Sequence, residues 1–244
     1  MLHYTRKGSG EVLVFIHGFL GAKEIFNEVI NKLSSNYDCI AVDLPGHGES
    51  KLEKENNSIY DYAKAVADVL AHERIKEATW LGHSMGSYIV LAAIEKAIAP
   101  IKRAILAYSS DLADTEEQIN KRKKQQQQIV DGGVEDFVNN VIGAFFGENP
   151  KEEHVNFARN IAYNASEEGL VMALETMKHR PNQQRLVEQL TIPVLVIEGS
   201  EDQVVKPIET NNPNVKKVIT KTGHLGMLED TQTFTKAIHD FMKY

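Results

Sequence analysis

Short apolar runs alternate along the chain with longer segments in which apolar residues recur every three or four positions. Such short runs are typical of strands that are buried on both faces of a parallel sheet. Leu2–Thr5 is a candidate edge strand. The alternation predicts an α/β fold, with a mostly parallel sheet of about seven strands flanked by helices. The clearest strand candidates are Val12–Ile16, Cys39–Val42, Thr79–Leu81, Ala104–Ala107, Val194–Glu198 and Val215–Ile219.

The segments between these strands carry the period of amphipathic helices. Apolar residues follow the 3.6-residue repeat over residues 25–33 and again over residues 59–70, where Ser58 is a plausible N-cap. Residues 84–97 are apolar nearly all round, which predicts a helix buried against the sheet. A last amphipathic helix is expected over about residues 231–242.

The alternation stops between about Asp111 and Leu190, where the sequence has no strand candidate and its helical segments are more polar. We interpret these residues as an all-helical cap inserted into one α/β domain. The expected division is a core made of residues 1–110 and 191–244 and a cap made of residues 111–190. The most biased run in the cap, Lys121–Gln128, is typical of a solvated helix face, with an anion-binding patch as the alternative.

The chain has 244 residues, a length typical of one domain that carries an insertion. Its 27 Lys and Arg against 34 Asp and Glu leave a net charge of −7, which disfavours binding to nucleic acid or to an anionic membrane. The single cysteine, Cys39, excludes an intrachain disulfide and a Cys-rich zinc site. The N-terminus lacks the apolar segment of a signal peptide, and no run approaches the ~18 apolar residues of a spanning helix, so we expect a cytoplasmic protein.

The strongest chemical signal is Gly82-His83-Ser84-Met85-Gly86, which fits the pattern G-x-S-x-G between a strand and an apolar helix. A sharp turn from strand to helix strains the serine backbone and requires small neighbours, hence the two glycines. The serine hydroxyl then lies at a helix N-terminus, where exposed N–H groups favour developing negative charge. The motif predicts that Ser84 is a nucleophile, with a merely structural turn as the alternative.

Two loops supply candidates for an oxyanion hole. The first, His17-Gly18-Phe19, follows a strand and can direct the backbone N–H of Phe19 at the oxygen of a tetrahedral intermediate. The second donor is the backbone N–H of Met85. We expect the His17 imidazole to hold this loop in place rather than to act as a base, and the Phe19 side chain to line the pocket.

The base and its orienting acid are expected later in the chain, in the order serine, acid, histidine. Asp202 follows the strand candidate Val194–Glu198, and His224 follows Val215–Ile219. Both therefore lie at the sheet edge where open α/β sheets place their sites. Asp202 is the predicted acid, with its neighbour Glu201 as the alternative, and His224 is the predicted base.

With these motifs the sequence resembles the α/β-hydrolase superfamily over essentially its whole length. The resemblance implies the α/β-hydrolase fold, a Ser84–His224–Asp202 triad, an oxyanion hole at Phe19 and Met85, and a helical cap between strands six and seven. Many relatives open with a two-stranded hairpin, for which only Leu2–Thr5 is present here. The matching motifs are His17-Gly18, Asp43–Ser50, Gly82–Gly86, Gly199–Asp202 and Gly223-His224.

Three functions fit this resemblance, and the first is a serine hydrolase that cleaves a small carboxylic ester or lactone through an acyl-enzyme on Ser84. The second is a triad-bearing lyase or carbon–carbon hydrolase, because His17–Leu20 and Asp43–Ser50 are similar to the menaquinone-pathway synthase. That enzyme typically carries an Arg soon after the nucleophile, which Ser84–Tyr88 lacks, so Arg159 or Arg180 would have to bind the substrate carboxylate. The third is a ligand-binding sensor that keeps its triad.

The esterase hypothesis requires an apolar acyl pocket under the cap. The expected lining residues are Phe19, Phe137, Phe145, Phe146 and Met172, and packing between cap helices is the alternative role for those in the cap. The resemblance implies no metal and no organic cofactor, since a serine triad needs neither. The expected partner is a small-molecule ester rather than nucleic acid or a membrane, and the expected state is a monomer or a homodimer.

Overall fold

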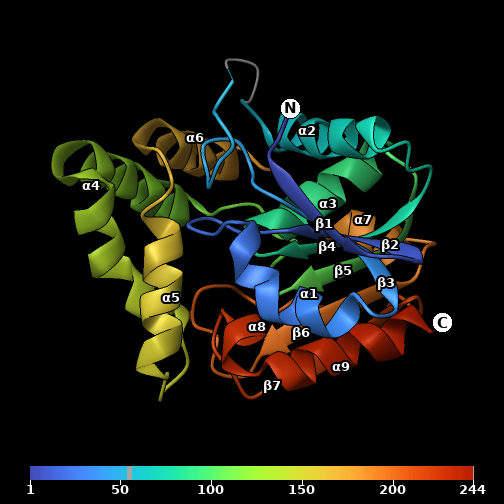
Figure 1. The fold of residues 1–244 in the computed structure, drawn as a ribbon. Helices are drawn as coiled ribbons and strands as arrows, with labels where there is room; N and C mark the ends of the chain where they lie inside the picture. The colour runs from blue at the N-terminus through green and yellow to red at the C-terminus, as the bar shows by residue number, and fades with distance from the viewer. Residues whose placement is uncertain (54–56, 244) are drawn as a thin grey trace.

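The computed structural model describes residues 1–53 and 57–243, which contain one seven-stranded sheet in the order β1-β3-β2-β4-β5-β6-β7 (Figure 1). β1 pairs with β3 antiparallel, and every other neighbouring pair is parallel. This topology confirms the predicted mostly parallel sheet. The strands are β1 (Tyr4–Gly8), β2 (Glu11–Ile16), β3 (Tyr37–Val42), β4 (Ala78–His83), β5 (Ile101–Ala107), β6 (Val194–Gly199) and β7 (Val215–Thr220).

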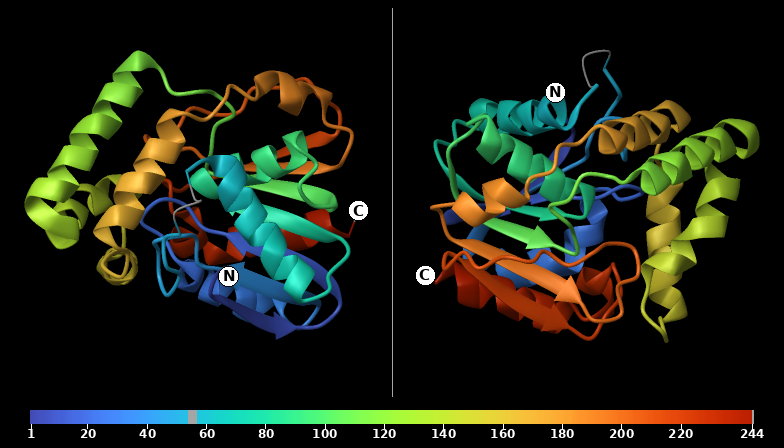
Figure 2. Two further views of the ribbon diagram at one scale, coloured as in Figure 1. Left: turned by 90° about the horizontal axis from the view of Figure 1, so that it is seen from above. Right: turned by 180° about the vertical axis from the view of Figure 1, so that it is seen from behind.

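Helices cover both faces of the sheet. On one face α1 (Asn27–Leu33), which follows the short 3-10 helix η1 (Lys23–Phe26), lies beside α9 (Thr231–Met242). On the other face lie α2 (Ile59–His72), α3 (Met85–Glu95) and α7 (Gln184–Gln189) (Figure 2). Every residue of β3 and β4 is buried, because apolar side chains on both sides of a covered strand escape water.

Local signals fix where several helices begin. Ser58 caps α2 by accepting a hydrogen bond from the Asp61 N–H at 3.3 Å, as the sequence predicted.

The first strand differs from its prediction: β1 begins at Tyr4 and ends at Gly8, whereas Leu2–Thr5 was expected. Four of its five residues are exposed, so the sequence of this strand lacks the apolar run that marks a buried strand. Backbone pairing with β3 holds the strand in the sheet instead.

Between β5 and β6 the described chain is entirely helical, as predicted. It forms α4 (Glu116–Val141), η2 (Ile142–Phe145), α5 (Glu152–Ala162), α6 (Glu167–Lys178) and α7. The family count of strands six and seven corresponds here to β5 and β6, because a single edge strand precedes β2 where the family pattern has a hairpin. α7 lies beside α3. Gln183, which directly precedes α7, donates a hydrogen bond from its side chain to Glu95 at the end of α3. The boundaries between core and cap stay a prediction.

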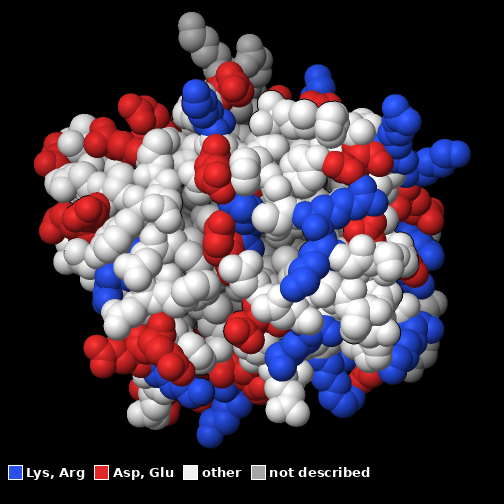
Figure 3. Space-filling model, in the orientation of Figure 1, with Lys and Arg blue, Asp and Glu red and all other residues white. Residues whose placement is uncertain are grey.

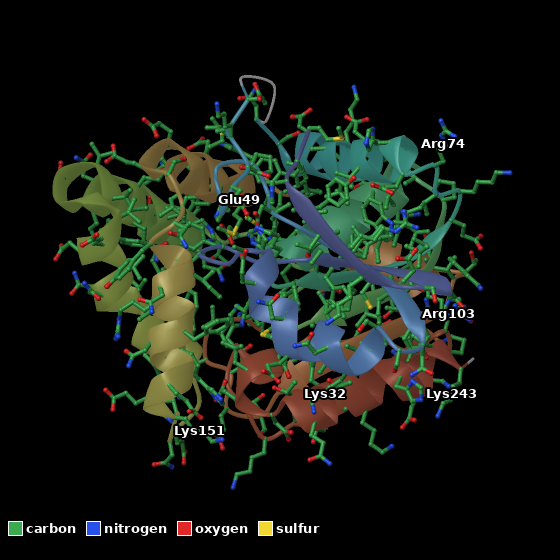
Figure 4. All side chains as sticks on the ribbon, in the orientation of Figure 1. Lys32, Glu49, Arg74, Arg103, Lys151 and Lys243 are labelled. Atoms are coloured by element: carbon green, nitrogen blue, oxygen red, sulfur yellow. The ribbon has the colours of Figure 1, made fainter. Side chains whose placement is uncertain are left out.

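The cap helices α4, α5 and α6 stand beside one edge of the sheet, toward which the carboxyl ends of the parallel strands point (Figure 2). Arg103, near the start of β5, marks the opposite side of the molecule, and Lys151 precedes α5 on the cap side (Figure 4). Acidic and basic side chains are interspersed over the face drawn in Figure 3. None of the helices in the described ranges has both the length and the apolar content needed to cross a membrane.

Candidate active site

Ser84 lies at the turn that joins β4 to α3, and its backbone is strained. Its φ of 51° and ψ of −116° are unfavourable for a residue with a Cβ. The two flanking glycines permit this turn: a Cβ on Gly82 would lie 2.3 Å from the carbonyl carbon of Gly86, and a Cβ on Gly86 would lie 2.2 Å from the Ile16 oxygen. Ser84 remains partly exposed, so the turn presents its hydroxyl at the sheet edge.

The loop after β2 packs directly on this turn. A Cβ on Gly18 would lie 2.9 Å from the Cβ of Ser84, so Phe19 follows a residue in close contact with the predicted nucleophile. Met85 begins α3, where N–H groups lack partners within the helix. The loop is fixed by His17, whose Nδ1 donates to the Gly18 oxygen at 2.8 Å and whose Nε2 accepts the Leu44 N–H at 2.9 Å. His17 is fully buried, and its imidazole holds the loop as expected.

Asp202 and His224 meet although they belong to different strand ends. His224 Nδ1 donates to Asp202 Oδ2 at 2.8 Å, and their side chains are only 2% and 5% exposed. The other carboxylate oxygen, Oδ1, accepts the Val204 N–H at 2.8 Å, which fixes the orientation of the acid. Glu201 turns elsewhere and accepts the Glu148 N–H at 2.9 Å. Of the two neighbouring acids, therefore, Asp202 is the one bonded to the histidine.

The turn that carries Ser84 is joined to the loop that carries His224 by His83, a residue that the sequence analysis did not single out. The His83 Nε2 donates to the His224 carbonyl oxygen at 2.9 Å, and the two rings lie 4.9 Å apart. Within residues 1–53 and 57–243 no hydrogen bond joins Ser84 Oγ to His224. Such bonds are often loose in unliganded sites and tighten when substrate binds. The position of His83, directly before the serine in a buried strand, was its only signal.

The predicted pocket residues lie at different distances from this site. The Phe137 ring contacts that of Phe19 edge-on at 6.2 Å, and the Phe145 ring contacts His224 edge-on at 5.5 Å. Phe146 is buried and packs against Gly223. A Cβ on Gly223 would lie 2.4 Å from the carbonyl carbon of Phe146. Met172 is partly exposed on α6.

The two arginines considered for carboxylate binding are engaged in internal contacts. The Arg180 guanidinium lies 4.2 Å above the ring of Tyr88 and donates to Asp114 Oδ1 at 2.6 Å. Arg159 donates to the side chain of Asn156. Arg180 is therefore held by a carboxylate and a ring, whereas Arg159 bonds only to Asn156 and its Nε is buried without a partner among the described residues, so of the two only Arg159 stays a candidate ligand for the lyase hypothesis.

One group of side chains has the spacing of a metal site, with ligand atoms of His3, Asp43 and Glu49 within 4.8 Å of one another. Lys23 already satisfies this charge: its Nζ lies 2.8 Å from Asp43 Oδ2 and 2.8 Å from Glu49 Oε1. Asp43 also accepts the backbone N–H groups of Lys23 and Glu49. These bonds hold together the loop that contains Glu49, which is labelled in Figure 4. These contacts favour a structural ion-pair cluster.

Three of the four histidines that are buried in the described residues, His17, His47 and His83, make the stability of the fold dependent on pH. Burial lowers the pKa of His17 to about 3 and that of His47 to about 4, and it lowers the pKa of His83 well below 6.5. Below pH 6.5 the unfolded chain therefore binds protons that the folded chain does not, so the free energy of unfolding falls as the pH falls toward these values. Near pH 5 the slope should approach about 4 kcal/mol per pH unit, about 1.4 for each histidine.

Urea unfolding between pH 7.5 and 4.5 measures this slope. Replacing His47 by glutamine should lower it by about one third, because one of the three protons taken up on unfolding is removed. A free energy of unfolding that stays constant from pH 7 to pH 5 would contradict the neutral burial of these rings.

A family model described as alpha/beta hydrolase fold matches residues 11–231. The chain is 29% identical over 268 residues to a protein of Bacillus subtilis (strain 168) named uncharacterized hydrolase YugF, with 99% of this chain and 93% of that protein covered. It is 26% identical over 253 residues to the pimeloyl-[acyl-carrier protein] methyl ester esterase of Wigglesworthia glossinidia brevipalpis, covering 97% and 95%. Among solved structures, MenH from S. aureus superposes with a TM-score of 0.86 at 27% identity, covering 100% and 98%.

Proposed function

Since the chain belongs to the family with the alpha/beta hydrolase fold and is a hydrolase, we propose that it is a serine hydrolase that cleaves a small carboxylic ester or lactone through an acyl-enzyme on Ser84. The observation that carries this proposal is the 2.8 Å hydrogen bond between Asp202 and His224, made at the sheet edge where the strained turn presents Ser84. A buried acid that orients an imidazole at the sheet edge that also presents a serine hydroxyl is the arrangement that activates a serine.

In the proposed reaction the neutral His224 Nε2 takes the proton of Ser84 Oγ as the oxygen attacks the ester carbonyl. The carbonyl oxygen becomes negative, and the backbone N–H groups of Phe19 and Met85 stabilise it. When the intermediate collapses, the bond to the alcohol oxygen breaks and His224 returns the proton to that oxygen. Water, deprotonated by the same imidazole, then attacks the acyl carbon and releases the carboxylic acid and the free serine.

The acid is held so that it can support both proton transfers. Asp202 Oδ2 accepts from Nδ1 of His224, which leaves Nε2 as the unprotonated atom of the neutral ring. When Nε2 gains a proton, the buried carboxylate stabilises the imidazolium, because the attraction between opposite charges is stronger away from water. The 2% exposure of the His224 side chain limits competition from solvent.

The ester specificity of the proposal draws on a relative. The protein from Wigglesworthia glossinidia brevipalpis is named a methyl ester esterase, and it matches nearly the full length of this chain. A panel of p-nitrophenyl esters of increasing acyl length, run beside labelling with a fluorophosphonate, tests the proposal. Turnover of short esters together with a covalent adduct on Ser84 supports it. An adduct without turnover of any ester would favour the lyase or the sensor instead.

We propose that Phe137 controls which acyl chains fit. Its ring is buried and contacts that of Phe19 edge-on. Truncating Phe137 to alanine should therefore open space beside Phe19 and shift the preferred acyl chain to longer esters, since each added methylene that is buried contributes about 0.8 kcal/mol. The rate on acetate should change little.

The ester panel and a melting curve, measured on the same Phe137→Ala protein, separate this role from simple packing. If the ring only holds the cap together, activity should fall in parallel on all chain lengths, and the truncation should remove about 3–5 kcal/mol of stability. A parallel loss would end the claim of selectivity and leave the triad proposal intact.

A further inference from the structure

A short segment of the cap, Phe145–Glu148, lies against the loop that carries the predicted base. The Phe145 carbonyl oxygen accepts the backbone N–H of His224 at 2.9 Å and that of Leu225 at 3.2 Å. The Phe145 ring also contacts the His224 imidazole edge-on. The backbone of the histidine loop is therefore bonded to the cap, in addition to the bonds it makes within the core.

Glu229, at the end of α8 (Gly226–Glu229), joins the same two segments with its two carboxylate oxygens. Oε1 accepts the Gly223 N–H at 3.0 Å, and Oε2 accepts the Gly147 N–H at 2.9 Å. One oxygen thus holds the residue that precedes His224, and the other holds the cap segment. Bonds from N–H groups to an ionised carboxylate are roughly twice as strong as neutral ones, so one side chain fixes both backbones.

The two backbones held by Glu229 approach so closely that both residues are glycines. A Cβ on Gly223 would lie 2.4 Å from the Gly147 nitrogen, and a Cβ on Gly147 would lie 3.2 Å from the Gly223 nitrogen. Direct backbone packing leaves no room for either segment to shift independently of the other. A movement of the cap segment is consequently transmitted to the loop that positions His224.

We propose that Glu229 is a positioning residue, which places His224 for proton transfer by tying its loop to the seated cap segment Phe145–Glu148. This inference rests on the proposed serine hydrolase function, because it assigns Glu229 a role in that reaction. Without the carboxylate, the Gly223 and Gly147 N–H groups lose their acceptor, and among the described residues the two segments are then joined only by the bonds to the Phe145 oxygen, so the histidine loop can shift. Misplacing a reacting group by about 1 Å costs about 10²-fold in rate.

Replacing Glu229 by glutamine tests the inference, because the amide keeps the size of the side chain but offers only one acceptor oxygen for the two N–H groups. We expect kcat on a short p-nitrophenyl ester to fall about 10- to 100-fold. The rate constant for fluorophosphonate labelling should fall by a similar factor, while the labelled fraction stays near one adduct per chain. The matched control is Glu188→Gln, which removes a carboxylate that accepts one backbone N–H, that of Asn211, at 3.1 Å.

A second variant acts from the other side of the contact. Gly223→Ala leaves Glu229 in place but forces the two backbones apart, so it should lower the labelling rate constant as well. Combined with Glu229→Gln, it should lower the rate by less than the product of the two single effects, because both changes release the same contact.

The labelling experiment separates positioning from folding. A merely structural role would lower the labelled fraction and leave the rate constant of the remaining sites unchanged, and this result would overturn the inference. Wild-type rate constants for Glu229→Gln would overturn it too, while the proposed function would stand. If the wild-type protein itself takes no label on Ser84, the proposed function fails and this inference fails with it.

Discussion

Replacing Ser84 by alanine is expected to lower the rate of ester hydrolysis by about 10⁶-fold and to leave the fold intact. The large loss follows because the members of a triad act as a unit, so that His224 and Asp202 have nothing to activate once the hydroxyl is gone. The fold should survive because the Ser84 side chain makes no capping hydrogen bond to α3. Alanine keeps the Cβ, and the turn keeps its shape. Steady-state kinetics and a melting curve measure the two effects.

The position of the covalent adduct gives an independent check on this assignment. Mass spectrometry after fluorophosphonate treatment should locate the adduct on Ser84 and find none on the alanine variant. Ser109 is the matched control, since its Oγ donates to the Ser84 carbonyl oxygen at 3.0 Å yet the residue is buried. Ser109→Ala should retain labelling on Ser84. An adduct on Ser109 or Ser110 in the wild-type protein would contradict the proposed nucleophile.

Much of the site could be predicted from the sequence because each triad residue comes soon after the end of a parallel strand: Ser84 follows β4 directly, Asp202 lies in the loop after β6, and His224 lies in the loop after β7. The apolar runs of β4 and β6 and the β-branched residues of β7 locate the strands, and their carboxyl ends must share one edge of the sheet. The residues after those ends, Ser84, Asp202 and His224, are thereby placed near one another without any knowledge of the loops. The sequence analysis also predicted that the turn at Ser84 requires small neighbours. The structure confirms this at Gly82 and Gly86, where a Cβ would clash with nearby backbone atoms.

What the sequence could not predict depends on contacts between segments far apart in the chain. Glu229 is hydrogen-bonded to Gly147, 82 residues earlier, and the His83 ring reaches a carbonyl oxygen 141 residues later. Neither contact has a periodic pattern, because each uses a backbone atom that every residue possesses. The break in α4 at Gly133, where φ is 79°, was marked only by a pair of glycines within a helical run.

Asp202→Asn is expected to lower kcat by about 10⁴-fold with little change in the fold. Asp202 Oδ2 accepts from Nδ1 of His224 at 2.8 Å, and this bond selects the ring tautomer in which Nε2 can take the serine proton. An asparagine that turns its NH₂ toward the ring would select the opposite tautomer, with the proton on Nε2 and no base for Ser84. The amide is nearly the same size as the carboxylate, so the bond from the Val204 N–H to the other oxygen can persist.

Glu201→Gln serves as the comparison because it makes the same chemical change one residue earlier. Glu201 accepts the Glu148 N–H at 2.9 Å and, among its described contacts, makes no bond to His224, so its loss should reduce kcat by less than about 10-fold. Kinetics on one short ester, with melting curves for both variants, measures the difference. If Glu201→Gln lost about 10⁴-fold while Asp202→Asn lost little, Glu201 would be the acid. The bond between Asp202 and His224 would then have to rearrange when substrate binds.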